Sequence, residues 1–187
     1  MRTSMKEVCE AMNCCLKQGY AQYWGTSVCQ IMQAYDICEE LKLEKPVVEQ
    51  CKNNMFCREK MENEYRDFFK KYKMGTTIFS PLKCGVLTGK YINEIHEDSR
   101  MNSKNERTKE MMEKNDYWKN KKEYDNKLNQ LKNIGENKLN CTLSQLAIAW
   151  IIANPDFSCC LLGETKGSQI EENAKAVEIY KKLDNLY

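Results

Sequence analysis

The sequence has a single histidine, His96, and no pair of cysteines with the spacing Cys-x-x-Cys, although it contains 11 cysteines in 187 residues. Structural zinc sites need closely spaced cysteine and histidine ligands, so this pattern argues against one. The cysteines also lie in apolar stretches such as residues 158–162, where a reduced thiol behaves as a small hydrophobe. We therefore expect free thiols, no metal site and a reducing cytosolic compartment.

Long apolar runs and an excess of one charge are also missing. The longest apolar stretch without charge, residues 143–153, is interrupted by Ser144 and Gln145 and is too short to cross a bilayer. The first residues do not show the charged, apolar and small-residue succession that is typical of a signal peptide. A net charge of +2 offers no concentrated basic face for a nucleic-acid backbone. These absences predict a cytoplasmic protein with no membrane insertion and no nucleic-acid partner.

The remaining composition, with 42% apolar and 30% charged residues, is typical of a soluble globular protein. A length of 187 residues fits one domain, and no linker divides the chain. Apolar positions at helical spacing alternate with short strand-like runs. Capping boxes at residues 4–7 and 142–145 mark two helix beginnings. The expected helices are residues 4–17, 30–43, 58–72, 146–153 and 168–181, and the expected strands are residues 21–25, 47–50, 75–80 and 159–162.

Residues 101–140 differ in composition, because Asn and Lys dominate and proline is absent. Helical spacing of apolar residues is limited there to Leu128, Leu131 and Ile134, so we expect one or two exposed helices in a surface insertion. The helix-to-strand units elsewhere imply an α/β fold with a parallel sheet covered by helices. Periodicity does not choose between a closed barrel and a doubly wound sheet.

Motifs at the ends of the expected strands favour the closed barrel over the doubly wound sheet. They are residues 23–27 (Tyr-Trp-Gly-Thr-Ser), 49–50, 55–60, 80–91 (Ser-Pro-Leu-Lys-Cys-Gly-Val-Leu-Thr-Gly-Lys-Tyr), 98–100, 141–150, 161–163 and 169–173. In this order they resemble the aldo-keto reductases, in the branch that includes the voltage-gated potassium channel β-subunits. Residues 80–91 are the most specific stretch, and the match covers nearly the whole chain except the Asn/Lys-rich segment.

The resemblance implies a TIM-type (β/α)8 barrel with its site at the C-terminal ends of the strands. By this alignment the chain supplies strands five to eight with their helices, the C-terminal half of the barrel. Residues 1–187 would then be an aldo-keto reductase-like domain whose N-terminal half is absent, with residues 101–140 inserted at its surface.

NADP(H) is the cofactor that the resemblance implies. Ser27 and Gln50 would hydrogen-bond the carboxamide of the nicotinamide, and Phe79 would stack on its ring. Without the family, Ser27 and Gln50 would be interpreted as satisfying loop backbone, and Phe79 as an ordinary core residue. The other implied cofactor-binding residues are Ser80, Pro81, Leu82, Lys83 and Cys84 over the pyrophosphate, Lys90 and Arg100 at the 2'-phosphate, and Gly163, Thr165, Gln169, Glu172 and Asn173 after the last strand.

General chemistry fits two of these assignments. An arginine such as Arg100 can form two parallel hydrogen bonds to phosphate oxygens, which a lysine cannot. The N-terminus of the helix expected from residue 168 offers unpaired N–H groups and favours anions. The sequence departs from the family pattern at four places. Val28 replaces a basic residue, three residues are missing before Ile31, and Lys83 replaces a small residue. Asp98 replaces a common aromatic and would place a negative charge near the phosphates.

No catalytic residue is assigned in this chain. The family uses a tyrosine as general acid, with a lysine, an aspartate, and a histidine or asparagine, and the resemblance places all of them before residue 1. His96 lies in a polar loop and is given no role. Three interpretations stay open: an NADP(H)-dependent reductase of small carbonyl substrates that is inactive as this fragment, a non-catalytic NADP(H)-binding β-subunit of a channel, and a degenerate half-barrel without cofactor. The expected partners are a small carbonyl substrate if the full barrel exists, and a channel α-subunit or further copies in a homo-oligomer.

Overall fold

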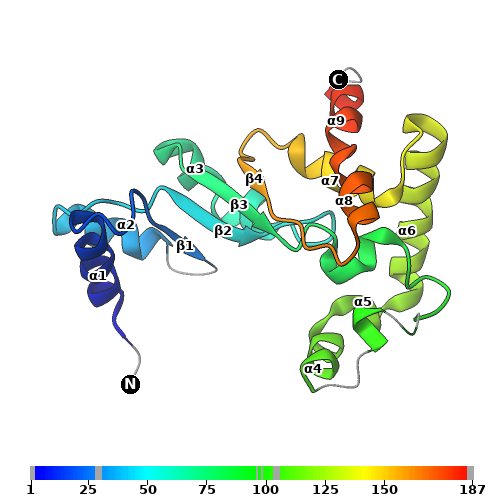
Figure 1. The fold of residues 1–187 in the computed structure, drawn as a ribbon, viewed down its shortest axis with the longest axis horizontal. Coiled ribbons are helices and arrows are strands. Elements are labelled where there is room, and N and C mark those ends of the chain that lie inside the picture. Colours follow the sequence, from blue (N-terminus) through cyan, green and yellow to red (C-terminus); the bar gives the residue numbers. More distant parts are fainter. Residues whose placement is uncertain (1–2, 28–30, 96, 98, 103–105, 185–187) are drawn as a thin grey trace. The chain divides into compact units, whose positions relative to one another are not determined.

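The structure, a computed structural model, describes residues 3–27, 31–95, 97, 99–102 and 106–184. It has an α/β fold built on one parallel sheet, as the sequence predicts (Figure 1). The sheet contains four strands in the order β1 (Gly25–Ser27), β2 (Val48–Lys52), β3 (Gly75–Phe79) and β4 (Cys159–Cys160). Because every neighbouring pair is parallel, the C-terminal ends of the strands share one edge of the sheet.

Helices occupy most of the remaining chain. They are α1 (Met5–Lys17), α2 (Ile31–Glu40), α3 (Arg66–Tyr72), α4 (Glu106–Lys114), α5 (Asp116–Lys119), α6 (Lys121–Ile134), α7 (Leu143–Ile152), α8 (Gly167–Ala174) and α9 (Ala176–Asp184). Short π-helices lie at Lys60–Glu64 and Gly135–Leu139, and 3-10 turns lie at Lys83–Thr88 and Arg100–Asn102. The described chain divides into two compact units: unit 1 with residues 3–53, 57–79 and 156–161, and unit 2 with residues 54–56, 80–155 and 162–184.

Unit 1 holds the sheet and a small core between its first helices. Cys9 of α1, Trp24, and Ala34 and Cys38 of α2 are buried together. The indole Nε1 of Trp24 donates to the backbone oxygen of Glu44 at 2.9 Å, so the ring is both packed and hydrogen-bonded. These contacts fix the chain just before β1, the strand that carries Ser27.

Glycine is required at the start of β1. A Cβ built on Gly25 would lie 2.4 Å from Cγ1 and 2.6 Å from the backbone oxygen of Val48, its register partner in β2. The strand therefore begins at Gly25, where the sequence pattern predicts its end. Tyr23, which the same pattern places inside the strand, is 72% exposed and lies outside the sheet.

Unit 2 packs around α7, which is apolar on nearly all sides and largely buried. Its N-cap Thr142 and Gln145 form the expected capping box, as do Ser4 and Glu7 at α1. Ala147 and Leu143 contact a cluster that includes Leu87 from the loop after β3, while the opposite side of α7 packs on α9.

The Asn/Lys-rich segment forms part of that core, which differs from the expectation of one or two exposed helices. Its described residues include the helices α4, α5 and α6, and Tyr117 and Leu128 are fully buried in the cluster with Leu87. Met101 is also buried there. The sequence pattern does not reveal this packing because the buried residues are few and widely spaced among polar ones.

Two further elements end earlier than expected. Strand β4 stops at Cys160, and Leu161 and Leu162 are 41% and 38% exposed. The last helix is divided at Lys175, whose N–H bonds to the carbonyl oxygens of Glu172 and Asn173 and closes α8 before α9 begins.

Candidate functional site

In unit 1, two of the sequence-predicted residues meet at the C-terminal ends of β1 and β2. Ser27 is the register partner of Gln50, and its hydroxyl donates to the backbone oxygen of Gln50 at 3.0 Å. The serine hydrogen therefore satisfies backbone in this structure, while its oxygen can still accept. Phe79 ends β3 opposite Lys52 and is half-buried.

The loop that begins unit 2 after β3 has an unusual backbone. Ser80, Lys83 and Cys84 have φ values of 55°, 47° and 57°, and Gly85 has a φ of 90°. A non-glycine residue in this left-handed region costs roughly 1–2 kcal/mol, and such strain tends to gather at ligand sites. The side-chain amide of Asn54 donates to the oxygen of Ser80 at 3.0 Å and helps to hold the turn. The loop is thus fixed in a shape that most sequences avoid.

Lys83 has an internal partner in unit 2. The residue is only 5% exposed, and its ammonium lies 5.6 Å from the ring centroid of Tyr124 on α6. A cation over an aromatic face is stabilised by the ring quadrupole. The lysine that departs from the family pattern is therefore held by the Asn/Lys-rich segment, and Pro81 beside it is buried.

Lys90 folds back across the same loop. Its side chain is exposed, and the ammonium lies 5.2 Å from the ring centroid of Tyr91. A Cβ on Gly85 would lie 2.8 Å from Cε and 3.2 Å from Nζ of Lys90, so glycine at this position makes room for the lysine. The Tyr91 hydroxyl donates to the backbone oxygen of Cys84 at 3.3 Å, which ties the end of the loop to its middle.

The end of this loop is anchored by residues that the sequence pattern does not single out. The Tyr117 hydroxyl lies 3.0 Å from the oxygen of Tyr91 and 2.8 Å from Oδ1 of Asp125, and the Lys121 ammonium donates to Ile92 O at 2.7 Å. Burial, reinforced by the hydrogen bond to Asp125, raises the pKa of Tyr117 well above its usual value, so it stays a donor. The i,i+4 spacing of Lys121 and Asp125 is the one pattern in the sequence that could have pointed to an ion pair in this anchor.

After β4, the predicted residues at the beginning of α8 are already bonded to one another. Oε1 of Gln169 accepts from the backbone N–H of Thr165 at 2.9 Å and of Lys166 at 3.3 Å. The buried Asn173 donates to Oε1 of Glu164 at 2.7 Å. The expected anion site therefore has part of its N–H groups covered by Gln169, and a ligand there would have to displace that side chain. Gly163 is exposed.

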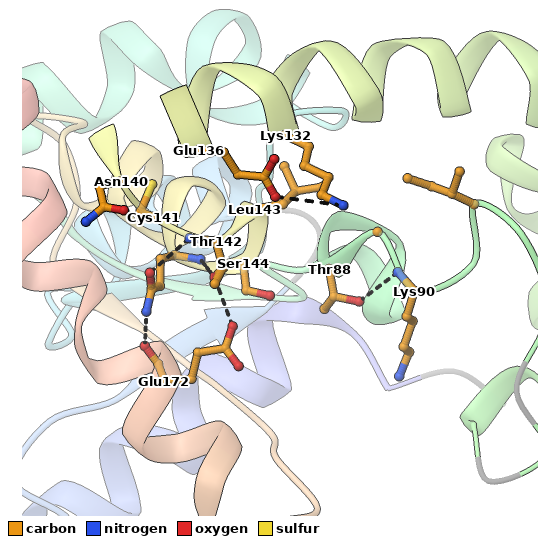
Figure 2. Close-up of a pocket in the computed structure, with 13 residues that line it drawn as sticks. Thr88, Lys90, Lys132, Glu136, Asn140, Cys141, Thr142, Leu143, Ser144 and Glu172 are labelled. Atoms are coloured by element: carbon orange, nitrogen blue, oxygen red, sulfur yellow. Dashed lines mark hydrogen bonds and ion pairs between the residues drawn. The ribbon is translucent and has the colours of Figure 1, made fainter. Parts of the chain in front are cut away.

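A cavity of about 580 Å³ with both polar and apolar walls lies in unit 2 and includes two of the predicted residues, Lys90 and Glu172 (Figure 2). Its volume is in the usual range for small-molecule sites. Lys132 and Glu136 on its wall form an ion pair at 3.8 Å. The cavity therefore carries both signs of charge.

Several residues named from the sequence cannot be placed. Val28, His96 and Asp98 lie outside the described residues. The backbone of Arg100 begins a 3-10 turn, but its side chain is outside the described part of the structure.

Within the described residues, no group of three or more His, Cys, Asp or Glu side chains could hold a metal ion, and the cysteines are free. Burial raises the pKa of Cys51 to about 11 and, with help from Cys9, that of Cys38 to about 12, so these thiols are poor nucleophiles at neutral pH. None of the described helices combines the length and apolar character that a membrane span needs.

Comparison with known proteins agrees with the strand-end motifs. Residues 1–185 match the aldo/keto reductase family. A protein described as a probable voltage-gated potassium channel subunit beta, from Arabidopsis thaliana, is 40% identical over 184 residues, which cover 95% of this chain and 53% of that relative. The chain thus spans about half the length of the curated relative it matches. A match along almost the full chain, together with the parallel α/β architecture, shows that this protein belongs to the aldo/keto reductase family, whose fold is the (β/α)8 barrel.

Proposed function

We propose that the chain is the NADP(H)-binding, C-terminal part of an aldo-keto reductase-like oxidoreductase that reduces carbonyl compounds by hydride transfer. The observation that carries this proposal is the loop from Ser80 to Gly89, with its left-handed residues and with Lys90 folded across Gly85. A strained loop with an exposed lysine folded across it suits a pyrophosphate with an adjoining phosphate.

Each part of the cofactor is assigned to residues whose chemistry suits it. Ser27 and Gln50 would orient the carboxamide of the nicotinamide, and Phe79 would support its ring. Lys90 and Arg100 carry the positive charge that the 2'-phosphate needs. The remaining residues of the proposal are Ser80, Pro81, Leu82, Lys83 and Cys84 around the pyrophosphate, and Gly163, Thr165, Gln169, Glu172 and Asn173 around the adenosine.

The chemistry that the cofactor supplies when bound is the hydride. The contribution of this chain is to present one face of the nicotinamide and to bind the phosphates. Lys83, whose ammonium lies over Tyr124, would contribute to the pyrophosphate site through the shape of the loop. A residue that protonates the carbonyl oxygen would come from another part of a complete barrel.

A second candidate function is a cytoplasmic, non-catalytic β-subunit of a voltage-gated potassium channel that binds NADP(H). The name of the Arabidopsis thaliana relative, at 40% identity, favours it. In this case the partner would be a channel α-subunit, which a reductase does not need. Aldehyde-dependent oxidation of NADPH by a protein that includes the preceding strands would favour the reductase.

The test of the proposed function is a titration of the purified 187-residue protein with NADPH and with NADH, followed by quenching of tryptophan fluorescence. We expect saturable binding of NADPH that is at least about tenfold tighter than that of NADH, because only NADPH carries the 2'-phosphate. Absence of saturable NADPH binding would overturn the proposal.

Two glycine variants give this titration a matched control. Gly85 and Gly89 both have positive φ, 90° and 78°, so alanine is strained at either position. Only at Gly85 would the added Cβ collide with Lys90, whereas at Gly89 its nearest contacts are at 3.5 Å. We expect Gly85→Ala to weaken NADPH binding by up to about tenfold relative to Gly89→Ala. Equal affinities of the two variants would show that NADPH binding does not need the Lys90 ammonium to lie over residue 85.

A further inference from the structure

The capping box of α7 has a second set of contacts in unit 2. Oγ1 of Thr142 donates to Oε1 of Glu172 at 2.9 Å, and Nε2 of Gln145 donates to the backbone oxygen of Glu172 at 2.9 Å (Figure 2). The same two side chains cap each other's backbone, with Thr142 N donating to Oε1 of Gln145 at 3.0 Å and Gln145 N to Oγ1 of Thr142 at 3.2 Å. One pair of residues therefore begins α7 and holds α8.

The hydrogen-bonding capacity of this pair is nearly used up. A threonine hydroxyl has one hydrogen, and here it goes to the Glu172 carboxylate. Gln145, only 8% exposed, uses its amide oxygen on Thr142 and its NH₂ group on Glu172. Glu172 thus accepts two hydrogen bonds, one at its carboxylate and one at its backbone, which fix both the position and the direction of its side chain.

The carboxylate is also in a favourable field. Thr142 is the N-cap of α7, so Oε1 of Glu172 lies at the positive end of that helix. Within the described residues, Oε2 receives no hydrogen bond, and Glu172 lines the same cavity as Lys90. One oxygen is thus held by the protein and the other is left to accept from a ligand.

We infer that Thr142 and Gln145 are positioning residues for the cofactor site: they hold Glu172 so that its second carboxylate oxygen meets an N–H donor of the adenosine. The inference rests on the proposed function. A carboxylate only accepts and is repelled by phosphate, so within the adenosine half of NADP(H) its suitable N–H partner is the 6-amino group of adenine. Thr142 and Gln145 also line the cavity, and the effect inferred for them on the adenine runs through the position of Glu172.

The experiment compares three replacements that all remain good helix N-caps. Thr142→Ser keeps the hydroxyl, Thr142→Asn offers an amide donor to Glu172, and Thr142→Asp places a second carboxylate against it. The readout is the ratio of dissociation constants for NADPH and for its hypoxanthine analogue, which lacks the 6-amino group. Loss of capping alone would change protein stability but not this ratio.

We expect wild type, Thr142→Ser and Thr142→Asn to prefer NADPH by about tenfold, and Thr142→Asp to bind both nucleotides about equally. Ser4→Val, which removes the corresponding capping box from α1 in unit 1, should lower the melting temperature and leave the ratio unchanged. A ratio in Thr142→Asp equal to that of wild type would overturn the inference while the proposed function stands. Failure of the wild type to bind either nucleotide would remove the proposed function, and the inference with it.

Discussion

Replacing Arg100 with alanine is expected to weaken NADP(H) binding about ten- to a hundredfold and to leave NAD(H) binding almost unchanged. A hydrogen bond to a charged group contributes roughly 1.5–3 kcal/mol, and each 1.4 kcal/mol is about tenfold in affinity. NAD(H) has no 2'-phosphate, so the loss should appear only with the phosphorylated cofactor. Calorimetric titration of both nucleotides measures the difference.

Two further variants define what Arg100 does. Arg100→Lys keeps the charge and loses the paired geometry, so it should recover only part of the affinity. Arg66→Ala removes an exposed arginine of α3 in unit 1 and serves as the control. Equal weakening of NADP(H) and NAD(H) in Arg100→Ala would mean that the residue supports the fold and does not select the cofactor.

The 187-residue polypeptide by itself is expected to give no aldehyde-dependent oxidation of NADPH and to self-associate. The resemblance assigns the family's acid–base residues to other strands of the barrel, so on the proposed function these 187 residues alone would lack the proton donor for hydride transfer. The described sheet also has two outer strands, β1 and β4, each paired on one side only. An unpaired strand edge is a template for further pairing.

Exposed apolar side chains next to these edges should add to the self-association. Tyr23 precedes β1 and Leu161 follows β4, and both are well exposed. Ile78 of β3 is buried within unit 1, so this side chain should not add to the association. Sedimentation velocity should show dimers or larger species. A stable monomer that steadily oxidises NADPH with a reactive aldehyde would show that the chain is misplaced within the fold.

Local signals predict helix beginnings well and strand ends poorly. Ser4 and Thr142 cap their helices as their capping boxes indicate, because that signal lies within four consecutive residues. The position of β1 depends instead on the close approach of Gly25 to Val48, 23 residues apart by register. No local pattern contains that distance, so the sequence places the strand several residues too early.

In the candidate site, too, features within short segments were predicted, and contacts between residues far apart in the sequence were not. The resemblance supplied Ser27 with Gln50 and the loop from Ser80, and the structure gives these segments their backbone geometry. The contacts of Lys83 with Tyr124 and of Glu172 with Thr142 join residues about 30 to 40 positions apart. Such contacts depend on packing that periodicity does not encode, which is why the anchoring role of the Asn/Lys-rich segment was not predicted.

The most direct measurement is amide hydrogen–deuterium exchange of the 187-residue protein with and without NADPH. The central claim is that the residues assigned to the cofactor bind NADP(H). It predicts that residues 80–89 and 163–173, together with the strand ends at Ser27 and Gln50, become protected over the same range of NADPH concentration. Absence of protection from residues 80–89 would contradict it.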